Sequence, residues 1–298
     1  MGTRLVWDRD GLDWPHRVAS RFVKDSGLTW HVQQFGRGPL VLLVHGTAAS
    51  THSWKGLAPL LAADATVLSV DLPGHAFTSP LSDGAMTVSS IANALGSLLQ
   101  SQNLRPTLCI GHSAGVAILV RMCRLQLLPA EARVIGLNGA LLPFDGFPGR
   151  LFSPLAKILA LNPLVPQFFS WQAKGGAVVS RILTGTGSRI DEASLRLYER
   201  LFRNPEHVAA ALAMMAHWEL NTMPNEIASL SQTLTLIACS NDRAVPAEVA
   251  FQMRDRVPSV RVELVRGLGH LAHEEQPSQI AQLICSIAGM KHCAGPAA

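Results

Sequence analysis

The sequence predicts an α/β protein with a mostly parallel central sheet, helices on both faces of the sheet, and an all-helical insertion. Three observations predict this fold class. Short apolar runs alternate with helix-forming stretches in both halves of the chain. Within residues 108–122 an apolar run meets a helix-forming run through a G-x-S-x-G pentapeptide. Residues 142–224 break the alternation, and we find no strand-like run there.

The expected strands and helices follow from these patterns in chain order. Residues 21–24 and 28–34 predict a hairpin around an Asp-Ser-Gly turn, and the apolar run 39–44 is typical of a strand buried on both faces. Further strands are expected at 66–70, 108–110, 134–137, 234–238 and 260–265, with helices at 52–61, 87–100, 116–122, 246–256 and 277–287.

The insertion is punctuated by prolines and glycines that separate short apolar helices. We expect these helices at 152–161, 166–173, 177–183, 192–202 and 206–220. An all-helical segment inside an alternating chain predicts a cap over the active-site face. The predicted organisation is a core of residues 1–141 and 225–298 with a cap of residues 142–224.

Composition limits the class of protein. With 48% hydrophobic and 15% charged residues in 298, the chain is globular rather than disordered. The net charge of +4 is small and dispersed, without a basic stripe, which disfavours nucleic-acid binding. We find no signal peptide and no membrane span. Five scattered cysteines without a C-x-x-C pair predict reduced thiols and a cytoplasmic protein.

The pentapeptide Gly111-His112-Ser113-Ala114-Gly115 is the strongest chemical signal. Strand, sharp turn and helix are the context that a nucleophile elbow requires. Positions 111 and 115 need glycine because a Cβ there would strike the neighbouring strand or helix. Ser113 is therefore the predicted nucleophile; the alternative is a glycine-flanked serine in an ordinary turn.

Two later loops carry the residues that would activate this serine. Asp242 and His270 each follow a predicted strand, and the order Ser, Asp, His is that of the α/β-hydrolases. His270 would accept the serine proton while Asp242 holds its imidazole in the required tautomer. Asp145 is an alternative acid and His273 an alternative base.

A metal site is not predicted, and neither is a cofactor. The i,i+3 spacing of His270 and His273 is similar to that of a metal-binding pair. However, no third ligand cluster and no H-E-x-x-H motif accompany it.

The motifs together resemble the α/β-hydrolase superfamily over nearly the whole chain. They are H-G-x at residue 45, D-x-P-G-H at 71, G-H-S-x-G at 111, N-D-x-x-V-P at 241 and G-H-x-x-x-x-E-x-P at 269. The segments D-G-L-D-W-P at 10–15 and W-H-V-Q at 30–33 are similar to one branch, the BchO proteins. These are magnesium-chelatase accessory proteins encoded in bacteriochlorophyll gene clusters.

This resemblance implies roles for further residues. The backbone N–H groups of Thr47 and Ala114 would form the oxyanion hole, while His45, Gly46 and His112 would shape the oxyanion and elbow loops.

The chain departs from the family pattern at two positions. Ala48 and Ala76 stand where such sequences often carry glycine, so a methyl group at 48 could crowd the oxyanion loop. Ala76 disfavours the left-handed backbone that glycine would permit.

Two hypotheses about function follow. The first is a serine hydrolase that forms an acyl-enzyme on Ser113 with an apolar ester. The resemblance implies a tetrapyrrole or lipid-like ester, in bacteriochlorophyll biosynthesis and photosynthesis. The second is a non-catalytic porphyrin-binding accessory protein of magnesium chelatase on a hydrolase scaffold. The resemblance is also compatible with a location at the surface of the photosynthetic membrane.

Apolar cap residues are candidates for the substrate pocket, with packing against the core as the alternative. They are Phe168, Trp171, Met214, Met215 and Trp218.

Overall fold

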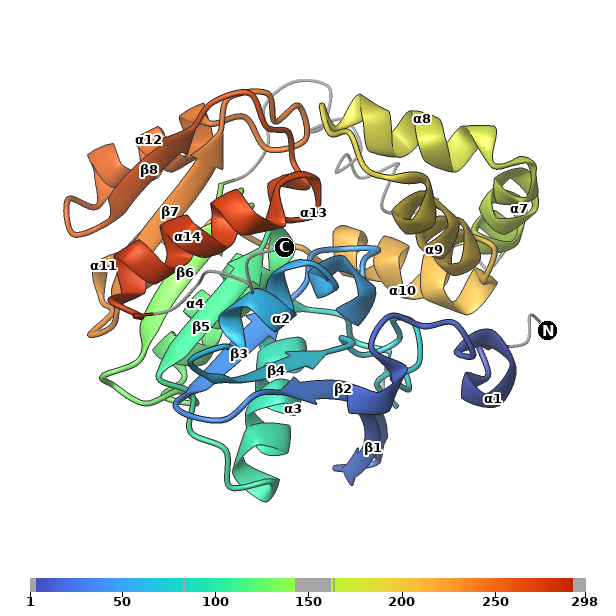
Figure 1. Cartoon of the computed structure of the whole chain (residues 1–298), viewed down its shortest axis with the longest axis horizontal. Coiled ribbons are helices and arrows are strands. Elements are labelled where there is room, and N and C mark those ends of the chain that lie inside the picture. Colours follow the sequence, from blue (N-terminus) through green and yellow to red (C-terminus); the bar gives the residue numbers. More distant parts are fainter. Residues whose placement is uncertain (1–3, 83, 143–161, 163, 292–298) are drawn as a thin grey trace.

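An eight-stranded sheet forms the centre of the molecule, in a computed structural model that describes residues 4–82, 84–142, 162 and 164–291 (Figure 1). The strand order is β1-β2-β4-β3-β5-β6-β7-β8. Strands β3 to β8 run parallel, whereas β2 is antiparallel to β1 and β4. The predicted α/β class with a mostly parallel sheet is therefore confirmed. The strands are β1 (Ser20–Asp25), β2 (Leu28–Phe35), β3 (Leu40–Val44), β4 (Thr66–Val70), β5 (Leu108–His112), β6 (Arg133–Leu137), β7 (Thr233–Cys239) and β8 (Arg261–Val265).

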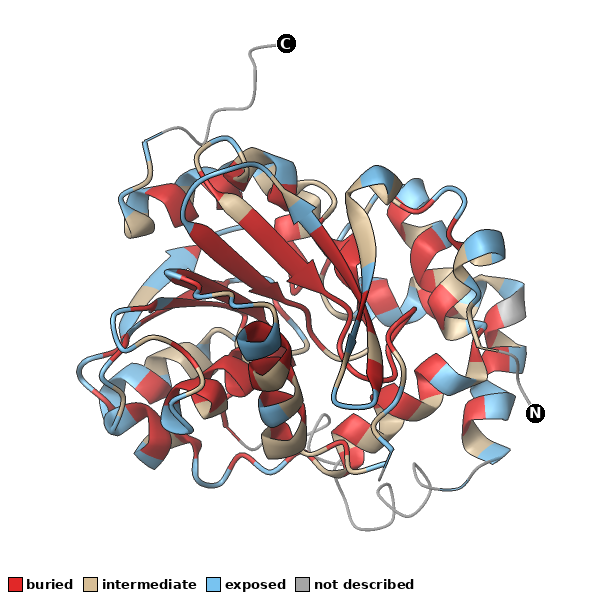
Figure 2. Ribbon diagram, turned by 90° about the horizontal axis from the view of Figure 1, so that it is seen from below, coloured by how far each residue is buried: buried red, intermediate tan, exposed pale blue. Residues whose placement is uncertain are grey.

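Both faces of the sheet are covered, which explains the unbroken apolar run in β3. Successive strand side chains point to opposite faces. Accordingly, Leu42 and Val44 belong to one core cluster and Val41 and Leu43 to the other. Figure 2 shows the central strands buried along their length. The first cluster includes α3 (Val88–Ser101), α4 (Ala114–Arg124), α11 (Met223–Ala228) and α12 (Glu248–Arg256), and the second includes α2 (Leu57–Leu61) and α14 (Pro277–Ala288).

Every described element between β6 and β7 is helical. Figure 1 shows α7 to α10 grouped on one side of the sheet. The helix expected at 206–220 is shorter in the structure, because α10 ends at Ala216. A separate short helix, α11, follows it. The expected helix at 152–161 lies outside the described residues, and the division into a core and a cap of residues 142–224 stays a prediction. The elements are α7 (Leu164–Gln172), η3 (Ala173–Gly175), α8 (Ala177–Gly185), α9 (Glu192–Phe202), α10 (Pro205–Ala216) and α11.

Short elements that the sequence did not indicate flank the sheet. They are α1 (Trp7–Asp10), η1 (Arg17–Ala19) and α13 (Ala272–Glu275). The expected helix at 52–61 is divided into η2 (Thr51–Trp54) and α2. The Ser50 hydroxyl accepts the His52 N–H at 3.4 Å, and the Asp71 carboxylate accepts the Thr51 N–H. With these side-chain partners, the first turn takes the tighter 3₁₀ form.

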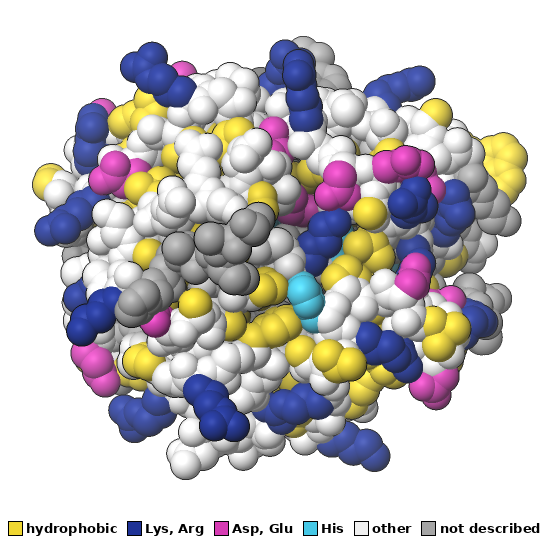
Figure 3. Space-filling view, viewed as in Figure 1, with side chains coloured by type: hydrophobic (Ala, Val, Ile, Leu, Met, Phe, Trp, Pro, Cys, Tyr) yellow, Lys and Arg dark blue, Asp and Glu magenta, His cyan; other side chains and the backbone are white. Residues whose placement is uncertain are grey.

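The charges on the surface and the state of the cysteines can be compared with the expectations of dispersed charge and reduced thiols. In Figure 3, basic side chains on the visible face are interspersed with acidic and uncharged ones. Among the described helices, none is both long and apolar enough to cross a bilayer. Cys109, Cys123 and Cys239 are free and buried, as expected, whereas Cys285 is disulfide-bonded, which departs from the prediction of reduced thiols throughout.

Candidate active site

Ser113 sits at a strained turn between β5 and α4. Its backbone has φ 52° and ψ −116°, and its N–H donates to the carbonyl oxygen of Leu137 at 2.9 Å. The flanking glycines allow this geometry. A Cβ at Gly111 would lie 2.7 Å from the backbone carbon of Gly115, and one at Gly115 would strike the Val44 carbonyl oxygen. The turn places Ser113 at the N-terminus of α4, where the helix dipole favours negative charge.

Gly115→Ala should destabilise the protein, because the new methyl meets backbone rather than a movable side chain. We expect the free energy of unfolding to fall by about 1–3 kcal/mol, measured by urea denaturation. Gly185→Ala is the matched control, since a Cβ there meets nothing within 4 Å. Equal unfolding midpoints for the two variants would contradict the prediction.

Asp242 and His270 are in contact. Asp242 follows β7 and His270 follows β8, and His270 Nδ1 lies 2.7 Å from Asp242 Oδ2. The other carboxylate oxygen accepts the N–H groups of Ala244 and Val245, each at 2.8 Å. The Asp242 side chain is fully buried, whereas that of His270 is 11% exposed. A carboxylate accepts from Nδ1–H, so the Nε2 of His270 is left with a free lone pair.

The backbone of His270 is held from two directions. His112 Nε2–H and the Asn138 side-chain amide both donate to the His270 carbonyl oxygen, each at 2.9 Å. Asn138 also donates to Gly269 O at 3.1 Å and accepts the Cys239 N–H at 2.9 Å. It therefore joins the end of β7 to the loop after β8. Sequence reasoning missed this role, although an asparagine directly after a strand, here at φ 47°, is a usable signal.

The predicted oxyanion loop, residues 45–50, follows β3. His45 Nδ1–H donates to Gly46 O at 2.7 Å, and its Nε2 accepts the Leu72 N–H at 2.9 Å. A turn is closed by the Ala49 N–H on Gly46 O at 3.2 Å, with Ala48 at φ 61°. Turns of this kind favour glycine at that position, and a left-handed alanine costs about 1–2 kcal/mol.

Ala76, the second alanine at a position where the family often has glycine, also adopts a left-handed backbone. Ala76, in the loop after β4, has φ 42° and is buried. Both alanines therefore occupy the left-handed region, so outside contacts must hold each of them there.

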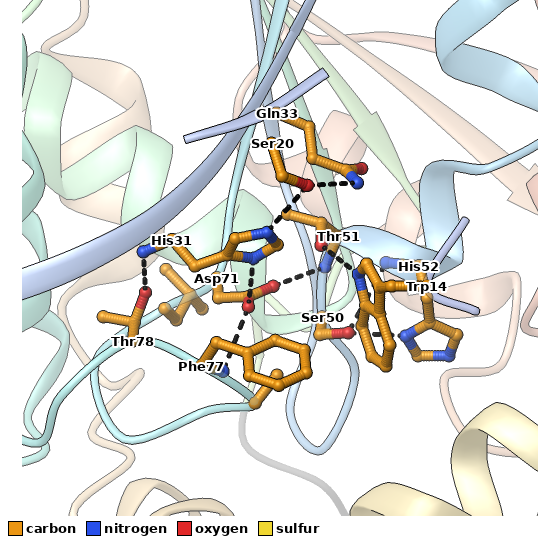
Figure 4. Close-up of polar contacts among 12 residues, drawn as sticks. Trp14, Ser20, His31, Gln33, Ser50, Thr51, His52, Asp71, Phe77 and Thr78 are labelled. Atoms are coloured by element: carbon orange, nitrogen blue, oxygen red, sulfur yellow. Dashed lines mark hydrogen bonds and ion pairs between the residues drawn. The ribbon is translucent and has the colours of Figure 1, made fainter. Parts of the chain in front are cut away.

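A buried polar network holds the residues at the end of the predicted oxyanion loop (Figure 4). His31 Nδ1 lies 2.7 Å from Asp71 Oδ2, and Asp71 Oδ1 accepts the Thr51 N–H at 2.7 Å. Burial acts to raise the pKa of Asp71, but His31 and the hydrogen bonds outweigh it and hold that pKa at about 2. Trp14 Nε1–H donates to Thr51 Oγ1 at 3.2 Å, so the N-terminal segment also fixes the residue that directly follows this loop.

One cavity of about 300 Å³ joins the predicted residues. Ser113 and His270 both line it, together with the predicted oxyanion residues Thr47 and Ala114. Ala114 opens α4, so its N–H has no partner within that helix. The rest of the wall is largely apolar: Ala48, Ala49, His112, Ala140, Ile182, Leu183, Thr186, Tyr198, Phe202, Met215, Trp218, Ala244, Val245 and Leu271.

The five predicted pocket residues divide into three groups. Met215 and Trp218 line the cavity. Met214 is buried beside it, with its sulfur 3.7 Å from the Thr47 hydroxyl. Phe168 and Trp171 do not line this cavity; they lie on α7 with exposed fractions of 54% and 64%. Because residues 164–172 are apolar on nearly every side of the helix, the sequence pattern did not indicate which side faces inward.

The alternative base, His273, lies outside the cavity that Ser113 and His270 line. His273 Nε2 is 2.8 Å from Ser53 Oγ, and its side chain is buried. Asp145 lies outside the described residues. Within the described ranges, no three ligating side chains form a group that could hold a metal ion.

The buried histidines make stability depend on pH. Burial lowers the pKa of His207 to about 4 and that of His273 to about 3. Between these values and the ordinary 6.5, the unfolded chain binds protons that the folded chain excludes, so stability falls as pH falls. Glu274 acts oppositely, because burial raises its pKa to about 7 and its contribution is lost as pH rises towards 7. The histidines outnumber it, since burial also lowers the pKa values of His45, His52, His75 and His112.

We therefore expect a net loss of stability when the pH is lowered from about 7.5 to about 5. Each buried histidine contributes up to about 1.4 kcal/mol per pH unit. Urea denaturation at several pH values measures this. An unfolding midpoint that is unchanged or higher at the lower pH would show that the histidines do not stay neutral.

Comparison with known proteins places this chain in a family. The model of the alpha/beta hydrolase family matches residues 41–283. The magnesium-chelatase 30 kDa subunit of Rhodobacter capsulatus is 34% identical over 274 residues, covering 91% of this chain and 95% of that protein. This identity confirms the BchO-like resemblance.

Two solved structures share the fold. An alpha/beta hydrolase fold protein from Burkholderia ambifaria superposes with a TM-score of 0.75 at 20% identity, covering 96% of this chain and 100% of that one. A thermophilic esterase from Thermogutta terrifontis superposes with a TM-score of 0.71 at 21% identity, covering 92% and 99%. The family match over residues 41–283 shows that the chain belongs to the alpha/beta hydrolase family.

Proposed function

We propose that this protein is a serine hydrolase that cleaves a carboxylic ester of an apolar substrate. One observation carries the proposal. His270, paired with Asp242 at 2.7 Å, lines the same mostly apolar cavity as a serine held on a strained elbow. Structural anchoring of the loop alone would not require His270 and Ser113 to line the same cavity.

In the proposed reaction, Ser113 Oγ attacks the ester carbonyl carbon and His270 Nε2 accepts the hydroxyl proton. The Thr47 and Ala114 N–H groups bind the oxyanion that forms. His270 then gives its proton to the departing alkoxide, which leaves an acyl group on Ser113. Water attacks this acyl-enzyme with His270 again accepting a proton, and the acid and free serine are released. Asp242 stabilises the imidazolium in both halves.

The cavity limits the substrate. Its volume of about 300 Å³ is at the lower end of ligand pockets, which span about 300–1,000 Å³. An acyl group of moderate size fits such a space, and the lining favours an apolar one. The name of the R. capsulatus relative supports a tetrapyrrole context. For a tetrapyrrole ester, we infer that an ester arm enters the cavity while the macrocycle stays outside.

A fluorophosphonate probe tests the proposal directly. The purified protein is incubated with the probe at neutral pH, and the adduct is mapped by mass spectrometry. We expect rapid labelling confined to Ser113 and lost in His270→Ala, because the serine needs its base. Absence of labelling in folded protein would refute the hydrolase proposal.

A second candidate is a porphyrin-binding accessory role without catalysis. The name of the 34% identical relative, a magnesium-chelatase subunit, favours it. Protoporphyrin titration followed by absorbance tests this role. Equal affinity in the wild-type protein and Ser113→Ala, with no probe labelling, would support it over the hydrolase.

A further inference from the structure

A histidine from the cap reaches the oxyanion loop. His207 lies in the first turn of α10, where the Asn204 side chain accepts its N–H at 2.9 Å as an N-cap. Its side chain is buried, so the ring has a fixed environment between cap and core.

The ring binds one backbone group of each core loop. His207 Nδ1 lies 3.1 Å from the Ala76 nitrogen, and His207 Nε2 lies 3.1 Å from the Ala48 carbonyl oxygen. A backbone N–H donates and a carbonyl accepts, so the ring must be neutral with its proton on Nε2. Burial, which holds the pKa of His207 at about 4, agrees with this neutral form.

The two residues that His207 binds are the alanines that stand in the left-handed region, Ala48 at φ 61° and Ala76 at φ 42°. Glycine would adopt such angles without help, whereas alanine needs a contact that favours them. His207 donates a hydrogen bond to the Ala48 carbonyl oxygen and accepts one from the Ala76 N–H. The chain thus carries, in its cap, a partner for both departures from the usual glycine pattern.

We propose that His207 is a positioning residue that holds the turn at Ala48 and thereby aims the Thr47 N–H at the oxyanion. Its position on α10 makes this alignment depend on the seating of the cap. The inference rests on the proposed hydrolase function. Because His207 does not line the cavity, it acts through the loop rather than by touching the substrate.

A pair of amide variants separates the two hydrogen bonds. In His207→Gln the side-chain amide nitrogen can replace Nε2 and still donate to Ala48. In His207→Asn the amide oxygen replaces Nδ1 and reaches only Ala76. Losing an oxyanion donor costs about 10²–10³ in rate, so misplacing one in His207→Asn should lower kcat for p-nitrophenyl butyrate by about 10–100-fold. KM should change by less than about twofold, because the hole acts on the transition state. His207→Gln should stay within about threefold of wild type.

Two further variants exclude a general loss of folding. Glu206→Gln alters an exposed neighbour on the same turn and should leave kcat unchanged. Adding Ala48→Gly to His207→Asn should restore kcat at least about fivefold, because glycine needs no contact to keep the turn. Equal activity of His207→Asn and His207→Gln, or no rescue by glycine, would overturn the proposal.

An NMR measurement tests the role of His207 in the loop independently of hydrolase activity. In protein with ¹³C-labelled alanine, the chemical shifts of Ala48 should indicate a left-handed backbone in the wild type and in His207→Gln. In His207→Asn, the chemical shifts should no longer indicate that conformation. If the wild type hydrolyses no ester, the proposed function fails, and this comparison still decides the role of His207 in the loop. Unchanged Ala48 shifts in His207→Asn would refute that role.

Discussion

Ser113→Ala is expected to lower kcat/KM for ester hydrolysis by about 10⁴-fold or more, to the level of the non-enzymatic reaction plus any contribution from the oxyanion hole. The variant removes the only atom that the proposed reaction joins to the acyl group. His270 and the oxyanion donors stay in place, so ligand binding should survive. Stopped assays with p-nitrophenyl butyrate, run at high enzyme concentration, measure the residual rate.

Ser259→Ala is the control for this variant, because Ser259 is exposed and distant in sequence from the elbow. It should keep full activity. Hydrolysis by Ser113→Ala at the wild-type rate would mean that the measured esterase activity does not use this serine.

Much of this site could be predicted because its residues are tied to local patterns. Apolar runs identify strands, and parallel strands bring the loops after them to one edge of the sheet. Together with the Ser, Asp, His order, that argument predicted that Asp242 would orient the His270 imidazole, although 28 residues separate them. The elbow was equally accessible, since the glycines at 111 and 115 report a close approach of backbone that any side chain would block.

What could not be predicted depends on long-range contacts without a periodic pattern. His207 meets Ala48 across 159 positions, and Asn138 meets His270 across 132. The sequence indicated that alanine at 48 and 76 is unusual, yet nothing in it named the partner that compensates.

The cap shows the same limit for a different reason. In α7, the exposed Phe168 and Trp171 are no less apolar than Met215 and Trp218, which line the cavity. Composition therefore does not distinguish a pocket wall from an exposed helix face. Only the tertiary arrangement of the cap does.

Asp242→Asn is expected to lower kcat/KM by about 10⁴-fold with little change in fold. The asparagine oxygen can still accept the N–H groups of Ala244 and Val245, which fix the loop. Its NH₂ group then faces His270 Nδ1 and favours the tautomer protonated on Nε2. That tautomer cannot accept the Ser113 proton, so the nucleophile stays inactive. Steady-state kinetics and probe labelling should fall together.

Parallel variants at the two candidate acids, Asp242 and Asp145, show which carboxylate orients His270. Asp145→Asn, tested in parallel, addresses the alternative acid, and Asp255→Asn is the control at an exposed position. Loss of activity in Asp242→Asn alone would assign the acid to the residue that contacts His270 at 2.7 Å. Loss in Asp145→Asn alone would show that this contact only anchors the loop. Because an asparagine preserves the loop contacts of Asp242, the comparison isolates the tautomer of His270 from the position of its ring.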